Sequence, residues 1–178
     1  MFAKTSSQNL SRRQRGAAFS LAEVVVTVAI TGVIFGGVIA ANTALTKRAE
    51  WTGQSLAAQA QAIQQIEQAR SALWDDSIGK NEMTNLNLVG WTYNPATGVG
   101  SGYSWTNLDL PIEGTNFIPA TNYVALTTLT NITGLAAIKL QMVRVDVVWR
   151  FRAFGSERLY TNTLATYYAP DNIDPSAL

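Results

Sequence analysis

The chain has 178 residues, of which 47% are hydrophobic and 14% charged, and this length suits one domain with a modest core. It contains no cysteine and no histidine. Disulfides, lipoprotein acylation, thiol nucleophiles, histidine-centred triads and the usual zinc sites are therefore excluded. Only carboxylates, serine, tyrosine and lysine remain for catalysis, so we expect that the protein is not an enzyme and needs no cofactor or metal.

The formal net charge of +1 hides an uneven distribution of charge along the chain. Residues 1–18 are polar and basic, and the remaining residues carry 9 basic and 12 acidic side chains, a net charge of −3. Binding of nucleic acid depends on clustered lysine and arginine side chains that neutralise phosphates. We therefore expect no strong binding of nucleic acid. The basic residues of the first segment are Lys4, Arg12, Arg13 and Arg15.

A long apolar run follows the basic segment. From Gly16 to Thr46 the only charged residue is Glu23, and about 20 apolar residues suffice to span a bilayer. The arginines before the run place the N-terminus on the cytoplasmic side. An acidic residue at the centre of a membrane helix costs about 2.5 to 3.5 kcal/mol on insertion scales. Glu23 is therefore expected to have a partner or a function, unless it stays hydrated among the lipid headgroups.

An ordinary secretory signal peptide is the rival interpretation of this region. Its apolar core would then be the run from Phe19 to Ala41. That run is longer than the roughly 7 to 15 residues typical of such a core. The length therefore favours a membrane anchor.

The order of residues at the junction is specific. A basic cluster is followed by the small residue Ala18, then Phe19, then Glu23 four residues later, and then the apolar helix. This order resembles the class III signal of type IV pilins and type II secretion pseudopilins. The resemblance implies that a prepilin peptidase removes residues 1–18, that Phe19 becomes an N-methylated terminus, and that Glu23 is the assembly residue.

The chain departs from the family pattern at one position. The family usually has glycine directly before the cleaved bond, whereas this chain has Ala18 there and Gly16 two positions earlier. Cleavage between Ala18 and Phe19 makes Glu23 the fifth residue, and cleavage between Gly16 and Ala17 makes it the seventh. The first bond is preferred, and the second is the alternative.

The helical pattern continues beyond the apolar run. Apolar residues recur at helical spacing and predict one continuous helix from Phe19 to about Trp74, with Gly79 and Asn81 as stop signals. Glycines inside the apolar run allow neighbouring helices to approach closely. The stripe comprises Leu45, Ala49, Leu56, Ile63, Ile66 and Leu73, and the glycines are Gly32, Gly36 and Gly37.

The last part of the chain predicts a sheet. Residues 82–120 indicate short strands and long loops, with a flexible loop at residues 98–102. Residues 143–151 alternate between apolar and polar, and a change of phase near Met142 predicts a bulge. A turn at residues 154–156 leads to a return strand from Arg158 to Tyr168. We expect residues 170–175 to form a solvated tail.

The predicted architecture is an α+β, pilin-like fold. It comprises a cleaved leader (residues 1–18), a long helix whose first half is transmembrane (19–78) and an extracytoplasmic antiparallel sheet head (79–178). The resemblance implies a structural subunit of a type IV pilus, type II secretion or DNA-uptake filament. The subunit would lie in the bacterial inner membrane before assembly and in a periplasmic or surface filament afterwards.

The predicted partners follow from the same resemblance. They are other pilin or pseudopilin subunits, contacted through the N-terminal helix, and the prepilin peptidase.

The missing cysteine-closed loop and the Glu67-Gln68-Ala69-Arg70 helix ending favour a minor subunit. The alternative is a single-span envelope protein with a ligand-binding or hydrolytic head. Aromatic residues are the candidates for contacts with unlike partners, namely Trp91, Tyr93, Tyr103 and Trp105.

Overall fold

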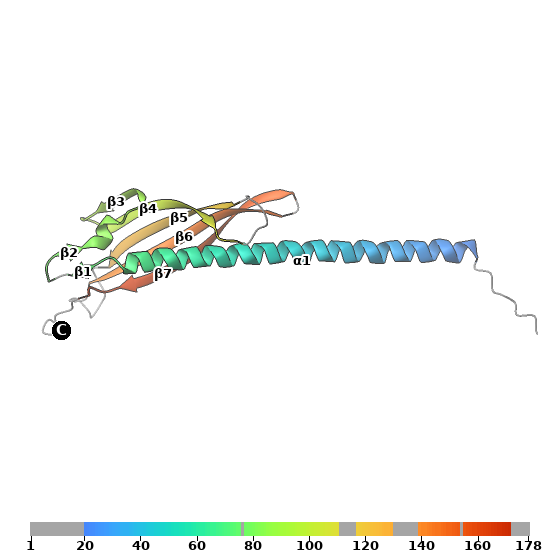
Figure 1. Ribbon diagram of the computed structural model, residues 1–178, viewed down its shortest axis with the longest axis horizontal. Helices are drawn as coiled ribbons and strands as arrows, with labels where there is room; N and C mark the ends of the chain where they lie inside the picture. Colours follow the sequence, from blue (N-terminus) through green and yellow to red (C-terminus); the bar gives the residue numbers. More distant parts are fainter. Residues whose placement is uncertain (1–19, 76, 111–116, 130–138, 154, 172–178) are drawn as a thin grey trace, which may run out of the picture. The chain divides into compact units, whose positions relative to one another are not determined.

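The computed structural model describes residues 20–75, 77–110, 117–129, 139–153 and 155–171. It divides the chain into two units, Met1–Leu45 and Thr46–Leu178. The described part has an α+β composition, with one long helix and antiparallel strands (Figure 1). The elements are α1 (Leu21–Arg70), β1 (Trp74–Asp75), β2 (Lys80–Asn81), the 3-10 helix η1 (Glu82–Asn85), β3 (Val89–Asn94), β4 (Val99–Leu108), β5 (Ile118–Leu129), β6 (Leu140–Ala153) and β7 (Ser156–Tyr168).

The predicted long helix is present as α1, which runs without interruption through Gly32, Gly36 and Gly37. Its end lies at Arg70, before the predicted end at about Trp74. The Ala72 N–H donates to the Ala69 carbonyl oxygen at 3.1 Å, a bond that tightens the last turn. Trp74 then pairs with Asn81 in the short β1–β2 sheet. The helix therefore ends before the strand pair that begins at Trp74.

The predicted stop signals have other roles. Gly79 lies in the turn between β1 and β2 with a φ of +67°, a conformation that glycine adopts without strain. The Asn81 side chain accepts a hydrogen bond from the Met83 N–H at 3.1 Å and so caps η1.

The head is built on a five-stranded antiparallel sheet with strand order β3-β4-β5-β6-β7. Each strand pairs with the next one in the sequence, so the sheet is a simple meander. The predicted hairpin is confirmed, with β6 and β7 joined at Gly155, which has a φ of +85°. Both ends of the sheet are edges, formed by β3 and β7.

The core of the head lies on the inner face of the sheet, against the second half of α1. Val143, Val145, Val147, Trp149 and Phe151 are all buried on this face, as the alternating pattern predicted. The predicted bulge near Met142 is wrong, because β6 pairs with both neighbours in unbroken register there. The register continues because Gln141 takes the inward position, where its side-chain nitrogen donates to Thr128 Oγ1 at 3.2 Å.

The helix contacts the sheet through a different face from the one predicted. The residues of α1 that are buried are Gln54, Ala58, Ala62, Ile66 and Ala69. Of the predicted stripe only Ile66 is buried, and Leu56 and Ile63 are 62% and 46% exposed. The large sheet residues fill the space, so small alanines on the helix complete the interface. The apolar pattern located the helix but chose the wrong side of it.

Polar contacts fix α1 along β7. The Asn162 side-chain nitrogen donates to the Ser55 carbonyl oxygen at 2.7 Å, and the Tyr168 hydroxyl donates to the Ile66 carbonyl oxygen at 2.9 Å. The rings of Trp51 and Tyr160 meet edge to face with centroids 6.0 Å apart. These contacts hold residues 51–66 of the helix parallel to the last strand.

The predicted flexible loop at residues 98–102 is wrong, because β4 begins at Val99. A Cβ atom on Gly100 would lie 2.9 Å from the Trp91 ring, and one on Gly102 would lie equally close to that ring. These glycines therefore leave room for an indole that covers the strand. The Trp91 Nε1–H donates to the Thr84 carbonyl oxygen at 2.9 Å and fixes the ring in place.

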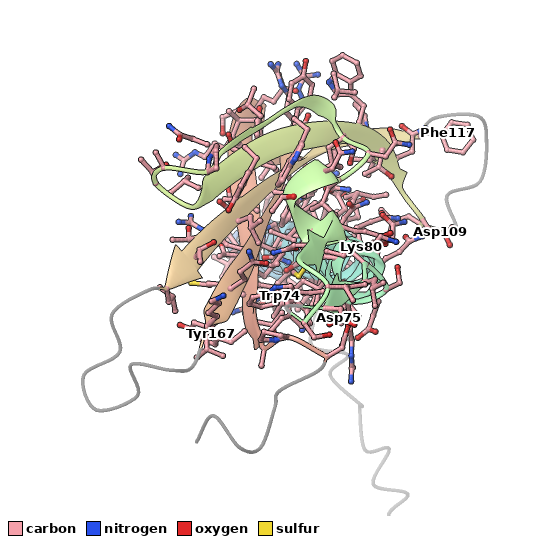
Figure 2. All side chains as sticks on the ribbon, turned by 90° about the vertical axis from the view of Figure 1, so that its left-hand side faces the viewer. Trp74, Asp75, Lys80, Asp109, Phe117 and Tyr167 are labelled. Carbon is pink, nitrogen blue, oxygen red and sulfur yellow. The ribbon has the colours of Figure 1, made fainter. Side chains whose placement is uncertain are left out.

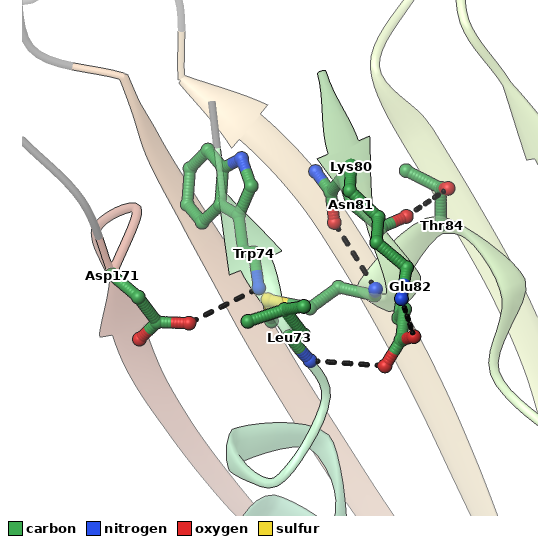
Figure 3. Close-up of polar contacts among 8 residues, drawn as sticks. Leu73, Trp74, Lys80, Asn81, Glu82, Thr84 and Asp171 are labelled. Carbon is green, nitrogen blue, oxygen red and sulfur yellow. Dashed lines mark hydrogen bonds and ion pairs between the residues drawn. The ribbon is translucent and has the colours of Figure 1, made fainter. Parts of the chain in front are cut away.

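A cluster of hydrogen bonds joins the end of α1 to the rest of the head, and we call it the helix-end clasp (Figure 3). The Glu82 N–H donates to the Leu73 carbonyl oxygen at 2.8 Å, and the Leu73 N–H donates to Glu82 Oε2 at 3.2 Å. Lys80 Nζ lies 2.9 Å from Glu82 Oε1. The Lys80 ammonium and the Leu73 N–H lower the pKa of the Glu82 carboxyl below its usual value of 4.5.

The clasp includes one residue of the predicted solvated tail. The Trp74 N–H donates to Asp171 Oδ2 at 3.1 Å, and the Asp171 N–H donates to the Trp74 carbonyl oxygen at 2.7 Å. Asp171 is therefore tied to the head, which corrects that expectation. Residues 172–175 of the predicted tail lie outside the described residues.

Candidate functional site

The first unit presents an apolar helix surface that nothing in the described structure covers. Every described residue of this unit, from Ser20 to Leu45, is exposed. Valine and isoleucine side chains prevail along it, with exposures that reach 77% at Val33 and 63% at Phe35. Burying one such side chain gains about 1.5 to 3 kcal/mol. An apolar environment would therefore stabilise this surface.

By length and composition this helix can cross a membrane, and none of its most apolar window is buried. Gly32 and Gly36 are about one helical turn apart on the same face of the helix, and a Cβ atom on either would meet nothing within 4 Å. The surface around these glycines is therefore low and open, as close packing of helices requires.

Glu23 lies in the first turn of α1, where it forms a reciprocal cap with Ser20. The Ser20 N–H donates to Glu23 Oε2 at 2.8 Å, and the Glu23 N–H donates to Ser20 Oγ at 3.3 Å. This is a capping box, and the carboxylate also interacts favourably with the positive end of the helix dipole. The carboxylate of Glu23 therefore faces the start of the helix and not its lateral apolar surface.

The role of Ser20 was missed in the sequence, although the Ser20-Leu21-Ala22-Glu23 order carries the signal of a capping box. The other two predicted site residues, Ala18 and Phe19, lie outside the described residues. Glu23 is thus the one predicted site residue whose surroundings the structure describes.

The structure separates the four candidate aromatic residues into two pairs. Trp91 and Tyr93 pack against the hydrophobic core as partly buried side chains. Tyr103 and Trp105 lie on the outer face of β4, with their ring centroids 5.2 Å apart and their planes at 71°. Trp105 is 70% exposed. Trp105 is therefore the one residue of these four that is largely exposed, and Tyr103 beside it is half-buried.

Tyr123 of β5 lies next to this outer-face pair and is 50% exposed, and its ring centroid lies 6.3 Å from that of Tyr103. The two residues are direct neighbours in the β4–β5 register. Tyr123 escaped the sequence analysis because β5 itself was not recognised. The inward positions of β5 include Asn122, which is fully buried and interrupts the alternation of apolar residues along the strand.

A hollow of about 540 Å³ adjoins these aromatic rings. Its lining includes Trp105, Thr121, Tyr123, Val148, Arg150 and Leu159, from four neighbouring strands. Other aromatic side chains are exposed at the periphery of the head, and Figure 2 shows Phe117 and Tyr167 pointing away from the sheet while Trp74 lies inside.

The described residues contain no group of three or more histidine, cysteine, aspartate or glutamate side chains that could hold a metal ion. Comparison with known proteins gives no further assignment, because no protein-family model, no curated protein and no solved structure matches the chain.

Proposed function

We propose that the protein is a structural subunit of a type IV pilin-like filament, either a pilus, a type II secretion pseudopilus or a DNA-uptake filament. The observation that carries this proposal is the uncovered apolar surface of α1. The helix starts at the capping box of Ser20 and Glu23, and its second half packs on the sheet of the head. Such a helix needs lipid before assembly and other helices afterwards. The chain would thus pass from the bacterial inner membrane to a periplasmic or surface filament.

The geometry at Glu23 supports a pairing with the mature N-terminus. The Glu23 carboxylate lies 2.8 Å from the Ser20 nitrogen. If the chain begins at Phe19, only a Cα and a carbonyl carbon separate that nitrogen from the free amino group. A carboxylate in an apolar medium is strongly unfavourable unless it is paired. Glu23 would therefore pair with the Phe19 ammonium of its own subunit or of a neighbouring one.

The first test is mass spectrometry of the mature protein. We expect a chain that starts at Phe19 with a methylated amino group, after a prepilin peptidase has cleaved the Ala18–Phe19 bond. A start at Ala17 would move the cleaved bond to the alternative site. A start after Ala40 or Ala44 would indicate an ordinary signal peptide and overturn the proposal.

The second test separates the charge of Glu23 from its role as a helix cap. Glu23→Ala removes both, whereas Glu23→Gln keeps a side chain that completes a capping box and removes only the charge. Ser20→Ala weakens the cap and leaves the charge. We expect all three variants to be exported and processed, and only the two Glu23 variants to enter filaments poorly. Normal incorporation of Glu23→Gln would show that the charge is not needed.

We also propose that the chain is a minor subunit that initiates or caps the filament. Its exposed outer-face aromatics fit contacts with unlike subunits, since aromatic residues dominate the binding energy of interfaces. Deletion of the gene should leave few or no filaments, and wild-type filaments should contain only traces of the chain. Filaments made mostly of this chain would contradict the assignment.

The second candidate is a single-span envelope protein whose head binds or hydrolyses a ligand. The hollow on the head favours it, because pockets of about 300 to 1,000 Å³ are typical of ligand sites. The mature N-terminus distinguishes the two candidates, since only a filament subunit requires the terminus at Phe19.

A further inference from the structure

The outer face of the sheet carries a depression that we call the outer trough, defined by Trp105, Thr121, Tyr123, Val148, Arg150 and Leu159. The strand register places Trp105, Thr121 and Val148 in one row across β4, β5 and β6. Directly opposed residues share a face. Their neighbours Ala120, Val147 and Trp149 are buried on the side of α1, so the trough lies on the opposite, outer face.

The walls of the trough are large apolar side chains that are exposed and do not belong to the buried core of the head. Trp105 is 70% exposed, Leu159 is 66% exposed and Tyr123 is 50% exposed. Thr121 and Val148, between these walls, are half-buried. Full burial of one such side chain would stabilise the protein or a complex by about 1.5 to 3 kcal/mol. A contiguous set of them on a rigid sheet indicates a surface that becomes covered.

The residue sizes across the trough favour an inserted side chain. The smaller residues Thr121 and Val148 are half-buried, whereas Trp105, Tyr123 and Leu159 around them are large and exposed. Tyr103 does not line the trough, but its ring meets that of Trp105 edge to face with centroids 5.2 Å apart and so supports that side of it. A hollow with a low floor and large apolar sides can accept an aliphatic or aromatic side chain.

The charge of Arg150 at the edge of the trough indicates which group of a partner would lie beside the inserted side chain. Arg150 pairs with Leu159 in the β6–β7 register and so stands beside the apolar wall. Its Nη1 lies 3.8 Å from Glu157 Oε2, and both side chains are at least half exposed. A guanidinium bound well to a carboxylate has N···O distances of about 2.7 to 2.9 Å. Arg150 is therefore only loosely engaged and can accept a second carboxylate.

We propose that the outer trough binds another protein chain, which inserts an apolar side chain between Trp105, Tyr123 and Leu159 and pairs a carboxylate with Arg150. Tryptophan, tyrosine and arginine are the residues that most often dominate the binding energy of protein interfaces. The proposal concerns the head and does not depend on how the N-terminus is processed or on whether filaments form.

The test uses the full chain in its native cells, with a photoreactive phenylalanine analogue at Thr161. This residue is exposed and lies beside Val148 in the β6–β7 register, outside the set that defines the trough. The matched control carries the same analogue at Gln64, an exposed position on α1. We expect irradiation at Thr161, but not at Gln64, to give one discrete adduct with a different protein. Peptide mapping should place the link beside an apolar residue that has an aspartate or glutamate nearby.

Second substitutions in the chain with the analogue at Thr161 then test the contacts. Trp105→Ala and Arg150→Glu should each reduce the adduct at least tenfold, and replacing the partner's carboxylate with lysine should restore it in the Arg150→Glu chain. Arg144→Glu, on the same face but engaged with Asp146 at 2.8 Å, should leave the adduct unchanged. Thermal melting checks that the variants fold.

Several results would overturn the proposal. These are the absence of a protein adduct, an adduct with a glycan, a lipid or a second copy of this chain, and an adduct that persists in Trp105→Ala and Arg150→Glu. Each result leaves the filament assignment untouched, because the mature terminus and filament incorporation are measured separately, but it removes the support that the outer-face aromatics give to a minor subunit. Conversely, a chain processed as an ordinary secretory protein could still give the expected adduct.

Discussion

Trp74 and Asp171 exchange two hydrogen bonds although 97 residues separate them in the sequence. The backbone of each residue takes part, and the Asp171 carboxylate adds the second acceptor. The pair joins the segment that follows α1 to the segment that follows β7. The two ends of the head are therefore fastened to each other beside a buried indole.

Asp171→Ala should destabilise the head, because it leaves the partly buried Trp74 N–H without its acceptor. The expected loss in the free energy of unfolding is about 1 to 3 kcal/mol. Asp171→Asn keeps an acceptor oxygen and should cost less. Urea denaturation of the full chain in detergent measures both. Asp109→Ala, at an exposed position, is the control, and equal stability of the two alanine variants would contradict the role of Asp171.

Gly102→Ala should also destabilise the head. The new methyl group would lie 2.9 Å from the Trp91 ring and 3.2 Å from the Trp91 Cα, so the indole must move. Overpacking of this kind costs about 1 to 3 kcal/mol. Gly53→Ala is the matched control, since its nearest neighbour is a Leu110 methyl at 3.6 Å and alanine favours a helix by up to about 1 kcal/mol. Thermal unfolding should therefore shift in opposite directions for the two variants.

Acid should weaken the helix-end clasp through Glu82. The pKa of this carboxyl is lowered in the folded state, first by the hydrogen bond from Lys80 and then by the Leu73 N–H. The unfolded chain therefore takes up the proton more readily, and the stabilisation present above about pH 4.5 is lost as the pH falls through the folded pKa. Glu82→Gln should be less stable than the wild type at pH 7, and the gap between the two melting temperatures should be narrower at pH 3. A gap as wide at pH 3 as at pH 7 would refute this, and Glu157→Gln is the control.

Alkali should weaken the contact between β7 and α1 through Tyr168. Burial, together with the nearby Glu67 carboxylate, raises the pKa of the Tyr168 hydroxyl above 10.0. The contribution of its hydrogen bond to Ile66 is therefore present below pH 10 and is lost as the pH rises through the folded pKa. Tyr168→Phe should lose about 1 kcal/mol at pH 7, and Tyr167→Phe, at a 60% exposed position, should lose almost nothing. Unfolding in urea at pH 7 and pH 11 checks both points.

The sequence by itself determined the features that depend on local pattern. A long apolar run with Glu23 as its only charge predicted the first half of α1. Alternation over residues 143–151 predicted β6 and its buried face, and the turn after it predicted the hairpin to β7. These signals are strong because each helix or strand carries its own periodicity. The capping box of Ser20 and Glu23 is also a local pattern, although the sequence analysis missed it.

Tertiary packing decided what local pattern could not. The buried face of α1 consists mainly of alanines because the sheet supplies the bulk, so the larger Leu56 and Ile63 lie on the exposed side. Gly100 and Gly102 lie in a strand, and the absence of a side chain there lets the Trp91 ring pack directly on the backbone of that strand.

The central strand β5 and the outer trough were likewise decided by packing. The buried Asn122 breaks the alternation of β5, and the residues of the trough come from four strands whose register the sequence does not state. Periodicity identifies which segments are helices and strands, whereas the match of volumes and hydrogen bonds between segments selects the faces that meet.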